Sequence, residues 1–137
     1  NKYVGWYDAP PEKTQDWLDD MLKWLDTPKG GGKGKPIILS EFGGGAIYGY
    51  RHPRETHWTE EYQCRVLEET LKVYLHHPRV CGAAIWQFCD VRLTPTWWSH
   101  RPRNMNNKGT VDEYRRPKLS YAVVQRMMRE AAKKWDR

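Results

Sequence analysis

Glu41 is the acidic residue with the clearest chemical context. It follows the apolar run Ile37-Ile38-Leu39 and Ser40, and a cluster of glycines begins two residues later. This pattern predicts a buried β-strand that ends at an ionisable side chain. Glu41 is therefore either an exposed carboxylate at a strand end or a catalytic group. The second interpretation has a physical basis, because active sites of α/β-barrel enzymes form at the carboxyl ends of parallel strands.

Aromatic side chains are unusually frequent, with 8 tryptophans and 8 tyrosines in the chain. One explanation is that they are large core residues. The alternative is a carbohydrate cleft, because the flat C–H faces of sugars pack on aromatic rings. Both explanations remain open from composition alone.

Cysteine spacing and charge exclude several classes of protein. Cys64, Cys81 and Cys89 are odd in number and lack CxxC spacing. We therefore expect buried free thiols, no disulfide framework, no metal and no cofactor. No targeting signal specifies a compartment, and the free cysteines favour a soluble, cytoplasmic protein. The formal net charge is +6, but basic residues mingle with carboxylates except at 126–137. No nucleic-acid partner is expected. No run approaches the ~20 apolar residues of a membrane span.

Three strand-like runs alternate with three amphipathic stretches. The expected strands lie near residues 2–7, 36–41 and 80–87. The expected helices follow them, through Trp17 to Leu25, Tyr62 to Tyr74, and Leu119 to Met128. Thr59 is expected to cap the second helix, with Glu60 and Glu61 in its first turn. A strand–helix–strand order predicts parallel strands joined by right-handed crossovers.

Two α/β architectures satisfy this order. One is a small doubly wound sheet, and the other is a sector of a (β/α)₈ barrel, which typically has about 250 residues. Long segments after two of the strands, 43–58 and 88–117, favour the barrel, because barrel enzymes carry their chemistry on such loops. The glycine-rich run 30–34 precedes a strand and lacks the Lys-Ser/Thr ending of a P-loop. It is predicted to be a flexible connector.

Five motifs in register resemble the β-glucuronidases of glycoside hydrolase family 2. They are Asn1-Lys2-Tyr3-Val4-Gly5-Trp6-Tyr7, Ser40-Glu41-Phe42-Gly43, Thr59-Glu60-Glu61-Tyr62-Gln63, Ile85-Trp86-Gln87-Phe88-Cys89-Asp90, and Asn106-Asn107-Lys108-Gly109 followed by Arg116-Pro117-Lys118. The resemblance spans nearly the whole chain. It implies that residues 1–137 are one partial domain, the C-terminal sector of a (β/α)₈ TIM barrel containing its sixth to eighth strands and their helices.

The resemblance also implies roles for individual residues. Glu41 would be the nucleophile of a retaining, double-displacement hydrolysis of β-D-glucuronides. Tyr3 and Tyr7 share strand parity and would lie beside it on one face. Trp86 would line the sugar subsite, and the peptide bond after it is commonly cis in such enzymes.

The most specific part of the resemblance is the Asn-x-Lys motif at Asn106 and Lys108. In β-glucuronidases this motif binds the C6 carboxylate of the sugar, for which an amide and an ammonium are suited. Without the family, the same residues would be an ordinary polar turn before Gly109. Arg101 and Arg103 lie nearby in the sequence and could assist.

One family feature is missing. The general acid/base is a Glu in an Asn-Glu pair, which occurs nowhere in the chain, and Asp90 lies on the wrong strand to replace it. We therefore expect a piece of a longer enzyme, and we expect this piece to be inactive alone. The full-length enzyme is separately expected to be a homo-oligomer. Alternatives are another family 2 activity, such as a β-galacturonidase or β-galactosidase, and a non-catalytic carbohydrate-binding half-barrel.

Overall fold

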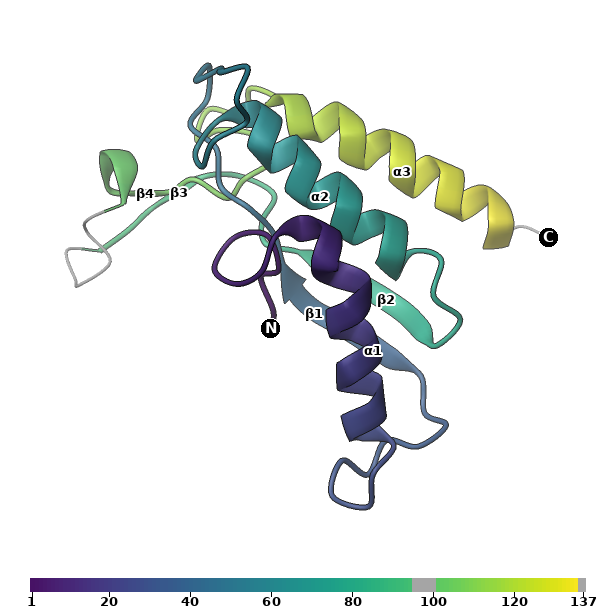
Figure 1. Ribbon diagram of the computed structural model, residues 1–137. Coiled ribbons are helices and arrows are strands. Elements are labelled where there is room, and N and C mark those ends of the chain that lie inside the picture. The colour runs from purple at the N-terminus through teal and green to yellow at the C-terminus, as the bar shows by residue number, and fades with distance from the viewer. Residues whose placement is uncertain (95–100, 136–137) are drawn as a thin grey trace.

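The computed structural model describes residues 1–94 and 101–135 of the chain. Three α-helices lie along one side of a short parallel sheet, and α2 and α3 run next to each other (Figure 1). The elements are a 3₁₀ helix η1 (Pro11–Lys13), α1 (Thr14–Leu25), β1 (Ile37–Phe42), α2 (Glu60–Tyr74), β2 (Val80–Ile85), β3 (Val91–Arg92), a 3₁₀ helix η3 (Pro102–Asn104), β4 (Met105–Asn106) and α3 (Leu119–Trp135).

The sheet contains two of the three predicted strands. β1 and β2 pair in parallel, with Ile37 opposite Val80 and Leu39 opposite Ala83. Helix α2 makes the crossover between them, as a parallel pair requires. The predicted parallel arrangement of these two strands is therefore confirmed.

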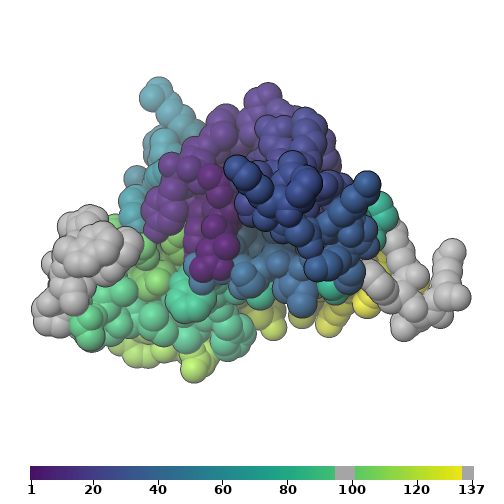
Figure 2. Space-filling model, turned by 90° about the horizontal axis from the view of Figure 1, so that it is seen from below, coloured from purple at the N-terminus to yellow at the C-terminus, as the bar shows by residue number. Residues whose placement is uncertain are grey.

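The predicted strand at 2–7 is wrong. The backbone N–H groups of Trp6 and Tyr7 both donate to the Tyr3 carbonyl, at 3.0 and 3.1 Å, which closes a turn. Gly5 has φ +85°, a left-handed conformation that disfavours other residues. One backbone bond still ties this segment to the sheet, from Lys2 N to the Glu41 carbonyl at 3.1 Å. In the space-filling view, the purple N-terminal segment lies beside the blue part of the chain (Figure 2).

The barrel-sector prediction is not confirmed. In the described residues, four strands form two separate two-stranded sheets. The second sheet is antiparallel and pairs Val91 with Asn106 and Arg92 with Met105. It folds the long segment after β2 back on itself, a local structure that the sequence did not predict. The part of the fold prediction that is confirmed is a unit that contains both helices and strands.

All three predicted helices are present. The Thr59 hydroxyl accepts a hydrogen bond from Tyr62 N at 3.2 Å, so Thr59 caps α2 as expected. The helices bury their apolar faces against the inner face of β1 and β2. The core cluster consists of Leu18, Leu39, Phe42, Leu67, Leu71, Tyr74, Val80 and Met127.

Three smaller predictions have mixed outcomes. The glycine-rich run lies between α1 and β1, where Gly32 N bonds to the Leu25 carbonyl at 2.8 Å. The cysteines are free as predicted, but Cys81 is exposed and the other two are only partly buried. Val80, the residue before Cys81 on β2, is buried in the core, and successive side chains of a strand point to opposite faces, which accounts for the exposure of Cys81. Within the described residues, no helix is long and apolar enough to cross a membrane.

Candidate active site

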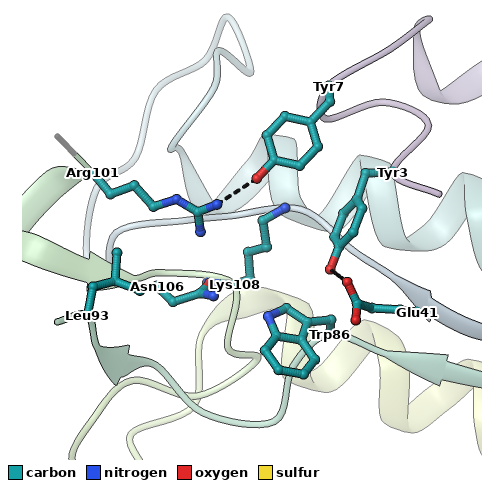
Figure 3. A pocket seen from close by; sticks show the side chains of 8 residues that line it. All are labelled: Tyr3, Tyr7, Glu41, Trp86, Leu93, Arg101, Asn106 and Lys108. Atoms are coloured by element: carbon teal, nitrogen blue, oxygen red, sulfur yellow. Dashed lines mark hydrogen bonds between the residues drawn. The ribbon is translucent and has the colours of Figure 1, made fainter. Parts of the chain in front are cut away.

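A pocket of about 300 Å³ opens where β1 and β2 end. Its lining comes from separate parts of the chain: the N-terminal turn, the end of β1, the residue after β2, Leu93, and the segment 101–108 (Figure 3). The lining residues are Tyr3, Tyr7, Glu41, Trp86, Leu93, Arg101, Asn106 and Lys108. All six residues singled out from the sequence are therefore in one pocket.

Glu41 is the next-to-last residue of β1, and a hydrogen bond from Tyr3 orients its carboxylate. The Tyr3 hydroxyl donates to Glu41 Oε1 at 2.6 Å (Figure 3). Burial, followed by this hydrogen bond and the nearby carboxylate charge, raises the pKa of the Tyr3 phenol above its usual range. Tyr3 therefore stays protonated and remains a hydrogen-bond donor to Glu41.

Tyr3 and Tyr7 share the pocket for a reason other than the predicted one. They do not alternate along a strand. The turn at Gly5 brings their rings to 5.4 Å between centroids, edge to face. Tyr3 faces Glu41, whereas the Tyr7 hydroxyl accepts a hydrogen bond from Arg101 Nη2 at 2.7 Å.

Lys108 is a buried amine that points at the aromatic wall of the pocket. Its Nζ lies 3.6 Å from the ring centroid of Tyr3, 4.2 Å from that of Tyr7 and 5.3 Å from that of Trp6. The residue is only 2% exposed, and its Nζ has no hydrogen-bond acceptor among the described residues. Burial, assisted by the Arg101 charge, lowers the pKa of Lys108 to about 6, against the opposing attraction of Glu41. Among the described residues, the Lys108 amine therefore has an unused capacity to donate a hydrogen bond within the pocket.

Asn106 and Trp86 complete the set of predicted residues. Asn106 ends β4, and its Oδ1 accepts a hydrogen bond from Lys108 N at 3.3 Å, so the two residues of the motif form one local unit. Trp86 directly follows β2, and its backbone N donates to the Phe42 carbonyl at 2.7 Å. The bond between Trp86 and Gln87 is cis, as the resemblance implied.

Arg101 and Arg103, the two nearby arginines, have different positions. Arg101 lines the pocket, whereas Arg103 turns away and pairs with Glu113. Leu93 also lines the pocket and had not been singled out. A lone leucine after a two-residue strand has no periodicity that would distinguish it, so no sequence signal could have identified it.

Asp90 does not face the pocket. It is buried in an ion pair with Lys118, at 2.8 Å between Oδ1 and Nζ. No second carboxylate joins Glu41 in the pocket lining of the described residues. Within the same residues, no group of three or more His, Cys, Asp or Glu side chains is arranged to hold a metal ion.

Comparisons with known proteins point to one group of enzymes, although no protein-family model matches the chain. A β-glucuronidase from Paenibacillus borealis is 30% identical over 124 residues, which cover 90% of this chain and 20% of that protein. A β-glucuronidase from Streptococcus agalactiae is 27% identical over 138 residues, covering 98% of this chain and 21% of that protein. The chain thus spans about a fifth of the length of these relatives.

Similar solved structures come from the same group of enzymes. A glycoside hydrolase family 2 β-galacturonidase from Eisenbergiella tayi, bound to galacturonate, has a TM-score of 0.87 and 48% identity, covering 95% of this chain and 23% of that one. An uncultured Clostridium β-glucuronidase has a TM-score of 0.76 and 32% identity, covering 94% of this chain and 22% of that one. The chain is similar to one segment of each of these longer enzymes.

Proposed function

We propose, on the premise that this chain is homologous to β-glucuronidases and to a β-galacturonidase of glycoside hydrolase family 2, that it forms the nucleophile-bearing and carboxylate-binding part of a retaining β-uronidase. One observation carries this proposal. A carboxylate and a buried amine that has no acceptor among the described residues line the same pocket, and Tyr3 contacts both of them.

Glu41 is the proposed nucleophile. Its carboxylate attacks the anomeric carbon while the glycosidic C–O bond breaks, which gives a covalent glycosyl ester. Water then attacks the same carbon, and the ester bond breaks to release the sugar with its anomeric configuration retained. Tyr3 supports this role by holding Oε1 at 2.6 Å, which fixes the direction from which the carboxylate attacks.

A second carboxyl group must protonate the leaving oxygen and later deprotonate the water, about 5–5.5 Å from the nucleophile in retaining enzymes. The pocket lining holds Glu41 as its only carboxylate among the described residues. We assign the acid/base to a part of the protein outside residues 1–137. Asp90 is unsuitable because its ion pair with Lys118 is fully buried.

Lys108, with Asn106 and Arg101, is the proposed site for the C6 carboxylate of the sugar. A uronate brings a full negative charge, which supplies the acceptor that Lys108 Nζ lacks. Arg101 adds a second positive charge to the same wall. A neutral hexose has a hydroxyl at C6. An uncharged hydroxyl cannot neutralise the positive charge of the buried Lys108 ammonium. Selection for uronides follows from that difference in charge.

β-Galacturonides are a second candidate for the substrate, beside β-glucuronides. The structure of the Eisenbergiella tayi β-galacturonidase is 48% identical to this chain, against 32% for the uncultured Clostridium β-glucuronidase. The two sugars differ only in the orientation of the C4 hydroxyl. Both carry the carboxylate that Lys108 is proposed to bind.

The test is turnover by the complete protein of 4-nitrophenyl β-D-glucuronide, β-D-galacturonide and β-D-galactoside. We expect a uronide to be the preferred substrate and Glu41→Gln to lower kcat on the order of 10³-fold or more, as loss of a nucleophile does elsewhere. Full turnover by the Glu41→Gln variant would refute the proposed nucleophile. Uronate binding without any turnover would support the non-catalytic alternative.

A further inference from the structure

Asp90 and Lys118 form a buried ion pair that takes no part in the proposed chemistry. Asp90 and Lys118 have fully inaccessible side chains and meet at 2.8 Å. Neither residue lines the pocket. Burial raises the pKa of the Asp90 carboxyl to about 6, although Lys118 opposes this rise, so the pair is held at a cost in desolvation. Its hydrogen bonds to the backbone show what this pair holds in place.

The pair binds the backbone on both sides of Lys108. Lys118 Nζ donates to the carbonyl of Asn107 at 3.1 Å, and Asp90 Oδ1 accepts from Gly109 N at 2.8 Å. Lys118 Nζ also donates to the Ala46 carbonyl at 2.6 Å, in the loop that follows β1. The residue before Lys108 and the residue after it are therefore held by one ion pair.

Gly109 packs directly against the backbone of Asp90. A Cβ atom on Gly109 would lie 2.3 Å from Asp90 N, so only glycine permits this approach. The backbone of Lys108 is held as well, because its carbonyl accepts a hydrogen bond from Gln87 N at 2.9 Å. Ala46 N donates to the Asn107 carbonyl at 2.8 Å, which joins Asn107 to the loop that follows β1.

We propose that Asp90 and Lys118 are positioning residues for uronate recognition, which fix the backbone at Asn107 and Gly109 so that the Lys108 amine reaches the substrate's carboxylate. This inference rests on the proposed function. The ion pair joins three parts of the chain, which are the loop after β1, the loop after β2 and the residue just before α3. It links all three to residues 107–109, which contain Lys108. It acts through Lys108 and touches no substrate.

The expected signature is weaker uronate binding without loss of the fold. A shift of about 1 Å in a binding group can lower activity on the order of 10²-fold. We expect Lys118→Met, which removes the charge but keeps a long apolar stem, to weaken binding of D-glucuronate and D-galacturonate by roughly 10- to 100-fold. KM for a uronide should rise by more than kcat falls, because Glu41 and Tyr3 are not held by this pair.

The experiment is calorimetric titration of the complete protein with D-glucuronate and D-galacturonate. Asp90→Asn is the milder second variant, since its amide oxygen can still accept from Gly109 N while the charge is lost. Leu71→Ala is the control, because it opens a cavity in the core far along α2 and destabilises the fold without touching the loop. The control should bind both sugars as the unmodified protein does.

A double variant separates positioning from general destabilisation. If Lys118 acts through Lys108, Lys118→Met should add little to the loss already caused by Lys108→Ala. Additive losses, or equal losses in Lys118→Met and Leu71→Ala, would overturn the inference. Unchanged uronate affinity in folded Lys118→Met would overturn it too. Absence of uronate binding by the unmodified protein would instead refute the proposed function.

Discussion

The amine of Lys108 lies 3.6 Å from the centre of the Tyr3 ring, on the residue whose hydroxyl holds Glu41. Tyr3 thus connects the two parts of the proposed site, the nucleophile and the carboxylate-binding amine. Its ring face attracts a cation, and its hydroxyl donates to an anion. Both interactions can be removed separately, which makes Tyr3 informative.

Tyr3→Phe keeps the ring next to Lys108 but removes the hydrogen bond to Glu41. A hydrogen bond to a charged group contributes about 1.5–3 kcal/mol, so we expect kcat/KM for a uronide to fall roughly 10- to 100-fold. Binding of D-glucuronate should change much less. Tyr74→Phe is the matched control, because Tyr74 is buried in the core and does not line the pocket. A fall in uronate affinity equal to the fall in kcat/KM would contradict this division of roles.

Lys108→Ala should change substrate preference. We expect kcat/KM for a uronide to fall roughly 10- to 100-fold or more, because the charged hydrogen bond to the C6 carboxylate is lost. The slow rate on the matched neutral glycoside should stay nearly unchanged. Lys72→Ala, an exposed lysine on α2, is the control. Equal losses on both substrates would show that Lys108 supports the loop and not substrate selection.

Uronate affinity should depend on pH through Lys108. With its pKa lowered to about 6 by burial, the amine is neutral in the empty pocket above that pH, and it must take up a proton when a carboxylate binds. Affinity is therefore highest below pH 6 and should fall as pH rises from 6 to 8, by at most about tenfold per pH unit for one linked proton. The other ionisable groups that line the pocket with Lys108 are those of Arg101, Glu41, Tyr3 and Tyr7.

The measurement is the dissociation constant of D-glucuronate between pH 5.5 and 8.5, by calorimetry in buffers of different ionisation enthalpy. Lys108→Met should show a flat profile over the same range, since it has no proton to gain. A slope that persists in Lys108→Met would assign the titration to another group.

Residues 1–137 produced on their own should not hydrolyse a uronide. They supply Glu41, but their described pocket contains no second carboxyl group to protonate the leaving oxygen. The measurement is release of 4-nitrophenol by the purified chain, after circular dichroism has shown that it is helical. Turnover that disappears in Glu41→Gln would mean that the acid/base lies within these residues.

Local patterns in the sequence were enough to identify the helices and the parallel strand pair. Apolar residues three and four positions apart predicted α1, α2 and α3, because a helix buries one face. Continuous apolar runs predicted β1 and β2, although the helices cover only one face of this pair and Ile38 on β1 is 67% exposed. Glu41 and Trp86 could be assigned to strand ends from the same apolar runs.

Local patterns failed where a short segment is controlled by contacts with distant parts of the chain. Residues 2–7 are as apolar as a strand, yet the positive φ of Gly5 and the hydrogen bonds to the Tyr3 carbonyl make them a turn. The β3–β4 pairing was missed because two-residue strands are too short to show a period.

The sequence by itself determined the three helices and the strands β1 and β2, and it singled out the residues that are proposed to act in a uronidase. Only the tertiary structure decided that Lys108 lies against Tyr3, that Arg101 and not Arg103 faces the pocket, and that Asp90 pairs with Lys118. The physical reason is range. Periodicity records which face of one element is buried, whereas a site is made by side chains that meet only when distant elements pack together.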